Sequence, residues 1–410
     1  MPGASESTQQ ATKPLRAEQR IVALDVVRGF AILGILLVNI TIFAGGDWLR
    51  PGAYEGADAA LRTLIAIFAE TKFITIFALL FGLGLAYQVA RADERGRPGL
   101  PLIVRRLAVL AVIGAVHAVL IWSGDILLPY VVLGIALLPF LRRRARTCVV
   151  WAVVLISLTG VLMLAGGGLL ALGQAVGGPE VQAEIDAGVA EVEVLADASE
   201  QAYTSGSYPA MLRQRLDELA LMWSSVAFIL PMLVGMGLLG VAVVRSGMLA
   251  DLEGRMALLR RWTVVGLAVG LPINLVGGVG LAGDATATTP ASILGWGLIV
   301  VGGPVLALGY AAIVTRGALA RPDGAVSRAL GNVGRTALSN YLLQSVLATG
   351  LFYGLALYGE LPLVVAFLAV PAIWAVNLVL SAWWTARFRY GPVEWVWRLG
   401  TYGSAPPLRR

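Results

Sequence analysis

Cysteine, histidine and charge are all scarce in this sequence of 410 residues. Cys148 and His117 are the single members of their residue types, which excludes a disulfide-rich secreted scaffold and a zinc site built from His and Cys. Only 14% of the residues are charged, against about 25% in a soluble globular domain. So few charges cannot coat the surface of a water-soluble chain of this length, and the composition fits neither a disordered chain nor a nucleic-acid binder.

Long apolar runs take the place of the missing charges. Hydrophobic residues make up 58% of the chain, and ten stretches are long and apolar enough to predict membrane-spanning helices of about 20 residues. Runs such as Val149–Leu172 are apolar on nearly every face, unlike the alternating strands of a β-barrel. The predicted fold class is therefore an all-α polytopic membrane helix bundle, with spans at about 28–46, 73–90, 103–123, 125–141, 148–173, 220–244, 262–282, 291–314, 336–358 and 361–386.

The basic residues fix the predicted orientation. If the ten spans alternate in direction, 26 of the 31 Lys and Arg residues fall on one side; the other five are Arg50, Arg62, Lys72, Arg213 and Arg215. Basic loops stay in the cytoplasm, so both termini are expected there. The net charge of +6 then follows from topology and not from a patch that binds an acidic partner.

Five segments are expected along the chain. Residues 1–20 are a polar cytoplasmic tail without a cleavable signal peptide, 21–173 hold five spans, 174–218 form an extracytoplasmic acidic segment, 219–390 hold five more spans, and 391–410 are a cytoplasmic C-terminal segment. Helical spacing of apolar residues predicts an amphipathic helix on the outer surface at 58–71. The acidic segment is either a solvated connector or a lid over the outer mouth. No matched pair of broken helices is evident.

His117 is the first candidate for chemistry. It lies eleven residues beyond Arg106, roughly 16 Å into the third span at about 1.5 Å per residue. Ionisable groups at membrane depth are costly and mark functional sites by default. A neutral histidine is a suitable general base, and Asp125, in the turn before the next span, is placed to orient it. The alternative is a buried histidine that only bonds to a backbone carbonyl.

Other polar and aromatic residues share the outer half of the predicted bundle. Asn39 lies at the depth of His117 on the first span, and Lys72 stands where the second span enters from outside. We expect these two, with Trp122 and Tyr130, to stabilise an oxyanion or hold an acceptor. The alternative for Lys72 is an interface anchor whose ammonium group reaches water.

The inner half carries a second set of candidates. Asp25 and Arg28 are three residues apart at the start of the first span, and Arg105 and Arg106 open the third. A Gly-rich turn at 331–334 leads through Arg335 into the ninth span, where Asn340 and Gln344 follow, and such a turn before a helix is a plausible phosphate cradle. The alternative is that these arginines serve topology alone. For 391–398, rich in Trp and Arg, the alternative is an interface anchor.

Five motifs in this order resemble the YeiB-like bacterial multi-pass membrane proteins. They are Leu24-Asp25-Val-Val-Arg28-Gly29 running to Val38-Asn39, Lys72-Phe-Ile-Thr-Ile-Phe77 running to Phe81-Gly82, His117 with Trp122-Ser-Gly124-Asp125-Ile-Leu, Gly334-Arg335-Thr-Ala-Leu-Ser339-Asn340-Tyr341 running to Gln344, and Gly391-Pro-Val-Glu394-Trp395-Val-Trp397-Arg398. The resemblance covers the chain after residue 20. That family is similar to transmembrane acyltransferases, which include the lysosomal heparan-α-glucosaminide N-acetyltransferase and use a histidine in the bundle.

The resemblance implies an acyltransferase of the bacterial plasma (inner) membrane. Acyl-CoA, in the simplest case acetyl-CoA, would bind from the cytoplasm, and no metal is expected. His117 would act as a base or carry the acyl group. The acceptor would be an extracytoplasmic glycan or lipid-linked component, with membrane lipids around the chain, no nucleic acid, and room for a homodimer. The alternatives are a transporter or lipid-handling protein, and a scaffold without chemistry.

Overall fold

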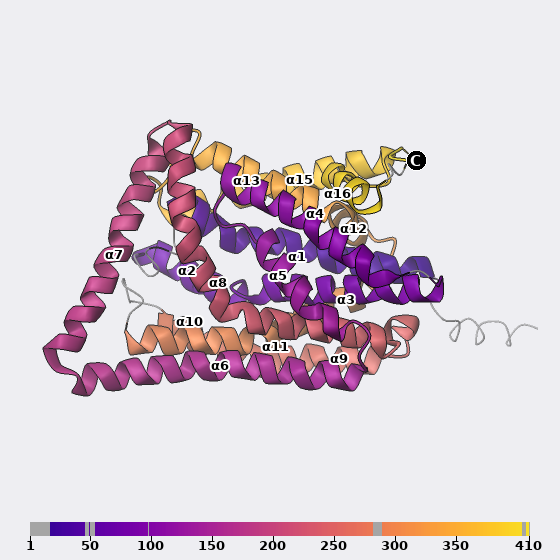
Figure 1. Cartoon of the computed structure of the whole chain (residues 1–410), viewed down its shortest axis with the longest axis horizontal. Coiled ribbons are helices and arrows are strands. Elements are labelled where there is room, and N and C mark those ends of the chain that lie inside the picture. Colours follow the sequence, from indigo (N-terminus) through magenta and orange to yellow (C-terminus); the bar gives the residue numbers. More distant parts are fainter. Residues whose placement is uncertain are drawn as a thin grey trace, which may run out of the picture.

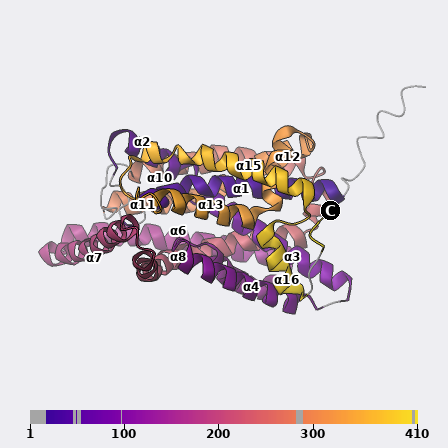
Figure 2. The same ribbon diagram turned by 90° about the horizontal axis from the view of Figure 1, so that it is seen from above.

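The helices of the molecule run side by side along its long axis (Figures 1 and 2). The computed structural model describes residues 17–45, 49, 54–96, 98–281, 289–403 and 407–409, and side chains from residue 22 onward. Within these ranges regular structure is helical, apart from an isolated bridge between Phe388 and Arg409. The described start of α1 and the C-terminus lie at the same end of the bundle.

Each of the ten predicted spans contains a helix, which confirms the all-α polytopic fold class. Among the residues described, eight helical segments are long and apolar enough to cross a membrane, and α5 and α13 are shorter. The segments are α1 (Ala17–Gly45), α3 (Lys72–Glu94), α4 (Gly99–Leu120), α5 (Leu127–Leu137), α6 (Ala145–Val176), α8 (Tyr208–Arg245), α9 (Met256–Val265) joined to α10 (Leu271–Leu281), α11 (Pro290–Ala320), α13 (Ala337–Phe352) and α15 (Ala369–Arg387).

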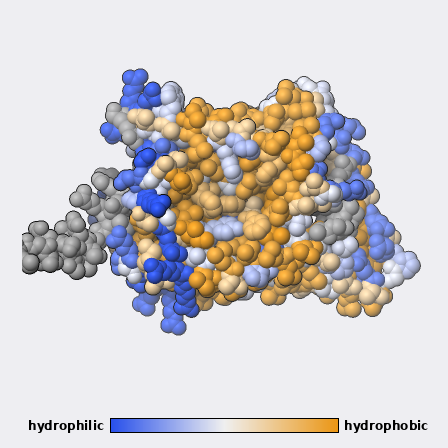
Figure 3. All heavy atoms as spheres, turned by 180° about the vertical axis from the view of Figure 1, so that it is seen from behind, coloured by the Kyte–Doolittle hydropathy of each residue, from blue (hydrophilic) through white to orange (hydrophobic). Residues whose placement is uncertain are grey.

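A hydrophobic surface belt separates two hydrophilic ends (Figure 3). Helix α6 contributes to the outward-facing apolar side chains, among them Val150, Val153 and Leu162, each more than half exposed. In water such a surface would drive aggregation, whereas hydrocarbon tails solvate it. The chain is a multi-pass membrane protein.

Further helices cover the two ends of the bundle. At the end away from the C-terminus lie α2 (Gly56–Phe68), α7 (Gly178–Thr204) and α14 (Leu363–Ala366); α12 (Ala325–Arg335) and α16 (Pro392–Tyr402) lie at the end where the chain terminates (Figure 1). The Asp58 carboxylate ties α2 to α14, because its two oxygens accept hydrogen bonds from the backbone N–H groups of Leu363 and Val364, each 2.9 Å long. A carboxylate at the first turn of a helix satisfies N–H groups that have no partner within the helix.

The 174–218 segment forms a helical hairpin. Helix α7 spans most of it, and α8 begins at Tyr208 and continues into the bundle. Within α7 only Ala196, Ser199 and Tyr203 are buried, all near its C-terminal end. The hairpin therefore meets the body of the protein through the end of α7 and the first turns of α8.

One expectation about local structure is wrong. The 331–334 segment is not a Gly-rich turn but the end of helix α12, whose glycines let α12 pack directly against α1: a Cβ on Gly334 would overlap the Asp25 carbonyl, and one on Gly29 the Leu330 carbonyl.

The helix predicted at 58–71 corresponds to α2. Its Leu64 and Phe68 are 51% and 43% exposed, while Ile65, Ala66 and Ile67 are buried. The buried face meets helix α10, which Ile67 contacts at Gly278.

Two helical segments are interrupted, although the sequence shows no matched pair of breaks. Helices α2 and α3 are separated at residues 69–71, where Thr71 has a φ of 65°. Helices α9 and α10 are joined by a π-helical turn at Gly266–Gly270, a form that is frequent at functional sites.

The orientation of the protein in the membrane can be tested by labelling introduced cysteines. The native Cys148 does not interfere, because it is fully buried. We expect Glu193→Cys, on the exposed face of α7, to react with a membrane-impermeant maleimide on intact bacterial cells. Arg255→Cys, just before α9, should react only after the cells are permeabilised, since positive loops stay in the cytoplasm. The opposite labelling pattern would reverse the topology.

Candidate functional site

The His117 and Asp125 side chains form a buried pair at the outer end of the α4–α5 hairpin. His117 Nδ1 lies 2.8 Å from Asp125 Oδ1, and the two side chains are only 1% and 2% exposed. His117 stands in the last turn of α4, and its carbonyl accepts from the N–H groups of Ile121 and Trp122. Asp125 precedes α5 and its Oδ2 accepts from Leu128 N–H at 2.8 Å. The expected pairing is therefore present in the structure.

The other nitrogen of the imidazole ring, Nε2, is buried and has no hydrogen-bond partner within the described residues. An ionised carboxylate only accepts hydrogen bonds, so its contact places the proton of a neutral His117 on Nδ1. Nε2 is then a bare lone pair in a water-poor setting, which is what a general base or nucleophile requires. A purely structural histidine would normally satisfy both nitrogens.

Aromatic rings enclose this pair. The centroid of the Tyr341 ring lies 5.1 Å from that of His117, and the Tyr341 hydroxyl accepts from Ile126 N–H at 3.2 Å. Trp122 meets His117 edge to face at 6.4 Å and packs on Phe43 of α1 at 4.0 Å. Asn39, also buried, lies one helical turn before Phe43 on α1. Helices α1, α4, α5 and α13 thus converge on the imidazole.

Two of the predicted outer residues serve other parts of the bundle. Lys72 is fully buried and donates from Nζ to the Ala66 carbonyl at 2.7 Å, so it does not reach water as an interface anchor would. Tyr130 donates its hydroxyl to the Ile74 carbonyl at 2.6 Å and packs between Phe77 and Phe81. Both side chains therefore secure helix packing around α2, α3 and α5.

The predicted inner residues gather at the end of the bundle where the chain terminates. Arg28 pairs with Asp25 at 2.6 Å and also reaches the Gly334 carbonyl at 3.4 Å. Arg335, on α12, lies near enough to act electrostatically on Asp25, and Arg28 and Arg398 do the same on Arg106. We call Arg28, Arg106, Arg335 and Arg398 the inner arginine cluster. Arg105 is exposed beside it, with Nη2 3.5 Å from the Gly400 carbonyl.

Helix α16 covers the inner arginine cluster. The Arg106 guanidinium lies 3.5 Å from the centroid of the Trp397 ring, and the Trp397 indole donates to the Arg106 carbonyl at 2.8 Å. One oxygen of Glu394 accepts from Leu338 N–H at 2.7 Å and Ser339 N–H at 3.2 Å, and the other accepts from the Ser339 hydroxyl. Burial raises the pKa of the Glu394 carboxyl. The aromatic segment at 391–398 therefore packs on the protein and is more than an interface anchor.

A chain of buried amides and hydroxyls runs between α13 and α15. Asn340 donates to the Ser381 hydroxyl at 2.8 Å and accepts from Asn377 at 2.9 Å. Gln344 donates to Asn377 Oδ1 at 3.0 Å and to the Ile32 carbonyl at 3.3 Å, while its own Oε1 lacks a partner. We call Asn340, Gln344, Asn377 and Ser381 the polar ladder. It leads from α12, beside Arg335, toward Tyr341 and His117.

Sequence reasoning missed the residues that cover the His117 pair from outside. Glu218 on α8 is buried and accepts hydrogen bonds from Ser123 at 2.5 Å, Ser199 at 2.8 Å and Tyr203 at 2.8 Å. Arg215, one turn earlier, donates to the Leu120 carbonyl at 2.8 Å. The only available signal was a pair of charged residues just before an apolar run, which is the usual pattern of an exposed helix end.

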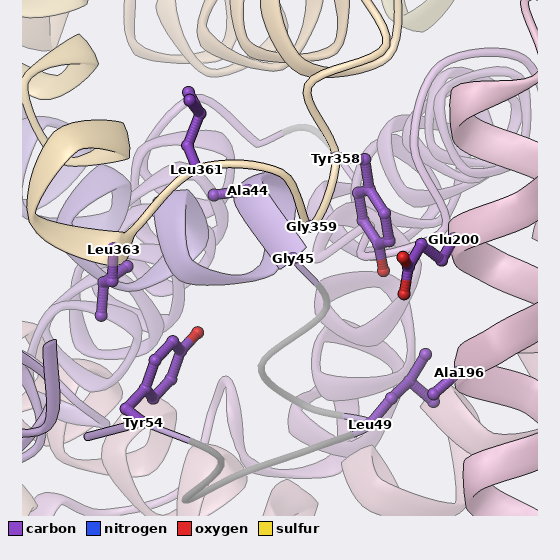
Figure 4. A pocket seen from close by; sticks show the side chains of 10 residues that line it. All are labelled: Ala44, Gly45, Leu49, Tyr54, Ala196, Glu200, Tyr358, Gly359, Leu361 and Leu363. Atoms are coloured by element: carbon purple, nitrogen blue, oxygen red, sulfur yellow. The ribbon is translucent and has the colours of Figure 1, made fainter.

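A pocket of about 170 Å³ opens at the outer end of the bundle (Figure 4). Tyr54, Glu200 and Tyr358 supply its polar side chains, among apolar neighbours such as Leu49 and Leu363. His117 does not line it: the pocket residues Ala44 and Tyr358 pack in one apolar cluster with Phe43 and Trp122, and Trp122 in turn contacts His117. The described residues hold no group of three or more His, Cys, Asp or Glu side chains that could bind a metal ion.

The attachment of α16 gives a prediction about stability. Glu394→Ala should leave the N–H groups of Leu338 and Ser339 buried without an acceptor, which costs about 1–3 kcal/mol of unfolding free energy. Chemical unfolding in detergent measures this loss, and trypsin should cleave after Arg398 faster than in the unchanged protein. Glu360→Ala, at an exposed carboxylate, is the matched control. Equal stability of the two variants would contradict the assigned role of Glu394.

Comparison with known proteins agrees with the architecture. Residues 243–404 match the family described as "Protein of unknown function (DUF418)". The chain is 32% identical to the protein YxaH of Bacillus subtilis, over 97% of this chain and 98% of the relative, and 32% identical to YeiB of Escherichia coli, over 95% and 98%. No solved structure matches. The chain belongs to the YeiB-like (DUF418) family of bacterial membrane proteins.

Proposed function

We propose that this protein is an acyltransferase of the bacterial inner membrane. It would move an acyl group, in the simplest case acetyl, from cytoplasmic acyl-CoA to an extracytoplasmic glycan or lipid-linked acceptor. The observation that carries the proposal is the buried His117–Asp125 pair, in which His117 Nε2 makes no hydrogen bond within the part of the chain that the structure describes. A buried, oriented imidazole with one bare nitrogen is the arrangement that activates a hydroxyl or amine for acyl transfer.

As a base, His117 acts through Nε2. Nε2 takes the proton from the acceptor O–H or N–H while the acceptor lone pair forms a bond to the thioester carbonyl carbon. When the tetrahedral intermediate collapses, the C–S bond breaks, and the CoA thiolate leaves and receives the proton from the imidazolium. Asp125 holds the ring by Nδ1 throughout and offsets its transient charge. No net proton is gained or lost by the protein.

As an acyl carrier, His117 would use the same lone pair. Nε2 attacks the thioester carbonyl carbon, the C–S bond breaks and the CoA thiolate leaves. The acceptor oxygen or nitrogen then bonds to the acyl carbon while the C–Nε2 bond breaks, and the acceptor proton passes to the freed Nε2 and on to solvent, where it balances the thiolate. The two routes differ in order, since the carrier route releases CoA before the acceptor reacts. Ping-pong kinetics, with acyl-histidine trapped by rapid quenching, would favour the carrier route.

The inner arginine cluster suits the phosphates of CoA. Arg28, Arg106 and Arg335 converge from α1, α4 and α12, and Arg398 joins them from α16. Guanidinium groups recognise phosphate oxygens in pairs, and within the cluster Arg28 is held by the Asp25 carboxylate at 2.6 Å. The cluster lies at the cytoplasmic end, where acyl-CoA is available. We therefore assign it to the donor.

The polar ladder suits the amide-containing arm between the phosphates and the thioester. Asn340 and Gln344 lie on one face of α13, four residues apart, and Gln344 Oε1 is buried without a partner. Helix α4 carries Arg106 and His117 eleven residues apart, roughly 16 Å along its axis. No single side chain bridges that span, so an extended donor arm is needed. Asn39 and Trp122 are the outer candidates for holding the acceptor or the oxyanion.

The test is acyl transfer by purified protein in lipid nanodiscs. With radiolabelled acetyl-CoA and an extract of envelope glycans and lipid-linked glycans, we expect label to move to acceptor. His117→Ala should lower the rate by roughly 10²- to 10⁴-fold, the usual contribution of a general base, without weakening CoA binding. Arg106→Ala should weaken CoA binding, measured by isothermal titration calorimetry.

A matched control variant distinguishes the loss of a CoA-binding arginine from the loss of any other exposed arginine. Arg260→Ala removes an exposed arginine of α9 that lies outside the inner arginine cluster, so CoA affinity should be unchanged. A chain that folds but neither binds CoA nor transfers or hydrolyses acetyl groups would overturn the proposal, as would full activity in His117→Ala.

One observation favours transport as a second candidate. Lys72 is buried at the break between α2 and α3, and interrupted helices with ionisable groups are typical of transporter binding sites. The pocket of Figure 4 opens on the same outer end and avoids His117. Uptake of an unmodified glycan or lipid-linked solute into proteoliposomes, abolished by Lys72→Ala but unaffected by His117→Ala, would establish this alternative.

A further inference from the structure

The α4–α5 turn is held from outside by one face of α8. The Tyr208 hydroxyl and Arg215 Nη1 both donate to the Leu120 carbonyl, each at 2.8 Å, and Glu218 accepts from the Ser123 hydroxyl at 2.5 Å. Positions 208, 215 and 218 are seven and three residues apart, so they share one helical face. We call these three residues the outer clamp. These three hydrogen bonds all fall on the short segment between His117 and Asp125.

We propose that the outer clamp is a positioning device that fixes the His117–Asp125 pair, with Glu218 as its central residue. The role in catalysis rests on the acyl transfer proposed above. The clamp itself rests on its own contacts. The residues at 121–126 between the two helices contain Gly124 and turn back on His117, whose carbonyl accepts from Ile121 and Trp122. The outer clamp adds hydrogen bonds from α8 at Leu120 and Ser123, on either side of that local turn.

Glu218 is the residue of the clamp that ties the hairpin to the turn. Its carboxyl accepts from Ser123 on one side and from Ser199 and Tyr203 of α7 on the other. Gln214 extends the network by donating to Ser199 at 2.9 Å. Glu218, Ser199, Ser123 and Tyr203 are each at most 3% exposed. Such a fully satisfied buried network is rigid, and removing one member leaves the others buried without partners.

Arg215 adds a cation at the end of α4. Its Nη1 meets the Leu120 carbonyl, one of the last carbonyls of the helix, which have no acceptor role inside the helix itself. A positive charge there also complements the negative end of the helix dipole. The contact therefore secures the last turn of α4, which is the turn that carries His117.

A single histidine in the chain makes the proposal directly testable. Protein labelled with ¹⁵N only in histidine, carrying an affinity tag without histidine, gives one pair of imidazole signals in nanodiscs. With the clamp intact we expect one tautomer, with the proton on Nδ1 and Nε2 bare. Ser123→Ala removes the hydroxyl that Glu218 holds, and Glu218→Ala removes the carboxyl, so both should yield a mixture of tautomers.

Matched variants show whether the turn itself is responsible. Tyr203→Phe takes one hydroxyl from Glu218 but leaves the bond from Ser123, so the single tautomer should persist. Glu193→Ala, at an exposed carboxylate of α7, should also have no effect. If Glu218→Ala does not fold, the milder Ser123→Ala decides. An unchanged pair of signals in folded Ser123→Ala would overturn the clamp.

Enzyme kinetics separate this proposal from the one on which it rests. In Ser123→Ala we expect kcat for acetyl transfer to fall about 10- to 100-fold, because a small displacement of a catalytic group has that effect, while the KM for acetyl-CoA stays unchanged. A rise in KM with constant kcat would contradict a positioning role. If no variant and no unchanged protein transfers acetyl but the tautomers still respond, the clamp stands and the acyltransferase proposal fails.

Discussion

The length of α5 is the constraint on which the outer half of the structure depends. With its final 3₁₀ turn it covers Leu127–Phe140, 14 residues, or roughly 21 Å of rise against about 30 Å of hydrocarbon. The turn between α4 and α5 therefore falls short of the outer surface, and its backbone groups need partners from the protein. The first turns of α8 supply a donor to the Leu120 carbonyl and also accept a hydrogen bond from the Ser123 hydroxyl. His117 and Asp125 are buried because their turn is.

At the inner end of the bundle, close helix packing positions the charged residues. Helix α12 lies directly against α1, and this contact brings Arg335 beside Asp25 and Arg28. A side chain at Gly29 or Gly334 would push the helices apart and separate the arginines. The glycines that looked like part of a phosphate loop thus contribute through backbone contact and not through their own N–H groups. Small residues at such contacts are what membrane helices use in place of a hydrophobic driving force.

The parts of the structure that could be predicted are those that hydropathy and charge determine. Ten apolar stretches and the arginine bias led to the helices and their order, and the lone histidine led to Asp125 because the two flank one short turn. Glu218 could not be found this way, since its partners Ser123 and Ser199 are distant in sequence and its surroundings resemble a solvated helix end. The interface-anchor alternative for Lys72 is wrong because its ammonium group is buried and donates to the Ala66 carbonyl of α2, a contact that composition does not show. Contacts between polar residues that are distant in sequence leave no recognisable pattern in the sequence around either residue.

Helices α4 and α13 connect the inner and outer ends of the bundle. Arg106 and His117 share helix α4, so the distance between the inner arginine cluster and the imidazole is set by the rise of one helix. Tyr341, beside the imidazole, and the ladder residues Asn340 and Gln344 share α13, whose first turn is held by Glu394 of α16. A movement of α16 would thus act on the helix that contacts His117, while a movement of α7 would act through Glu218 on Ser123, in the turn that carries Asp125. The imidazole contacts both Tyr341 and Asp125, and among the described residues its Nε2 makes no hydrogen bond.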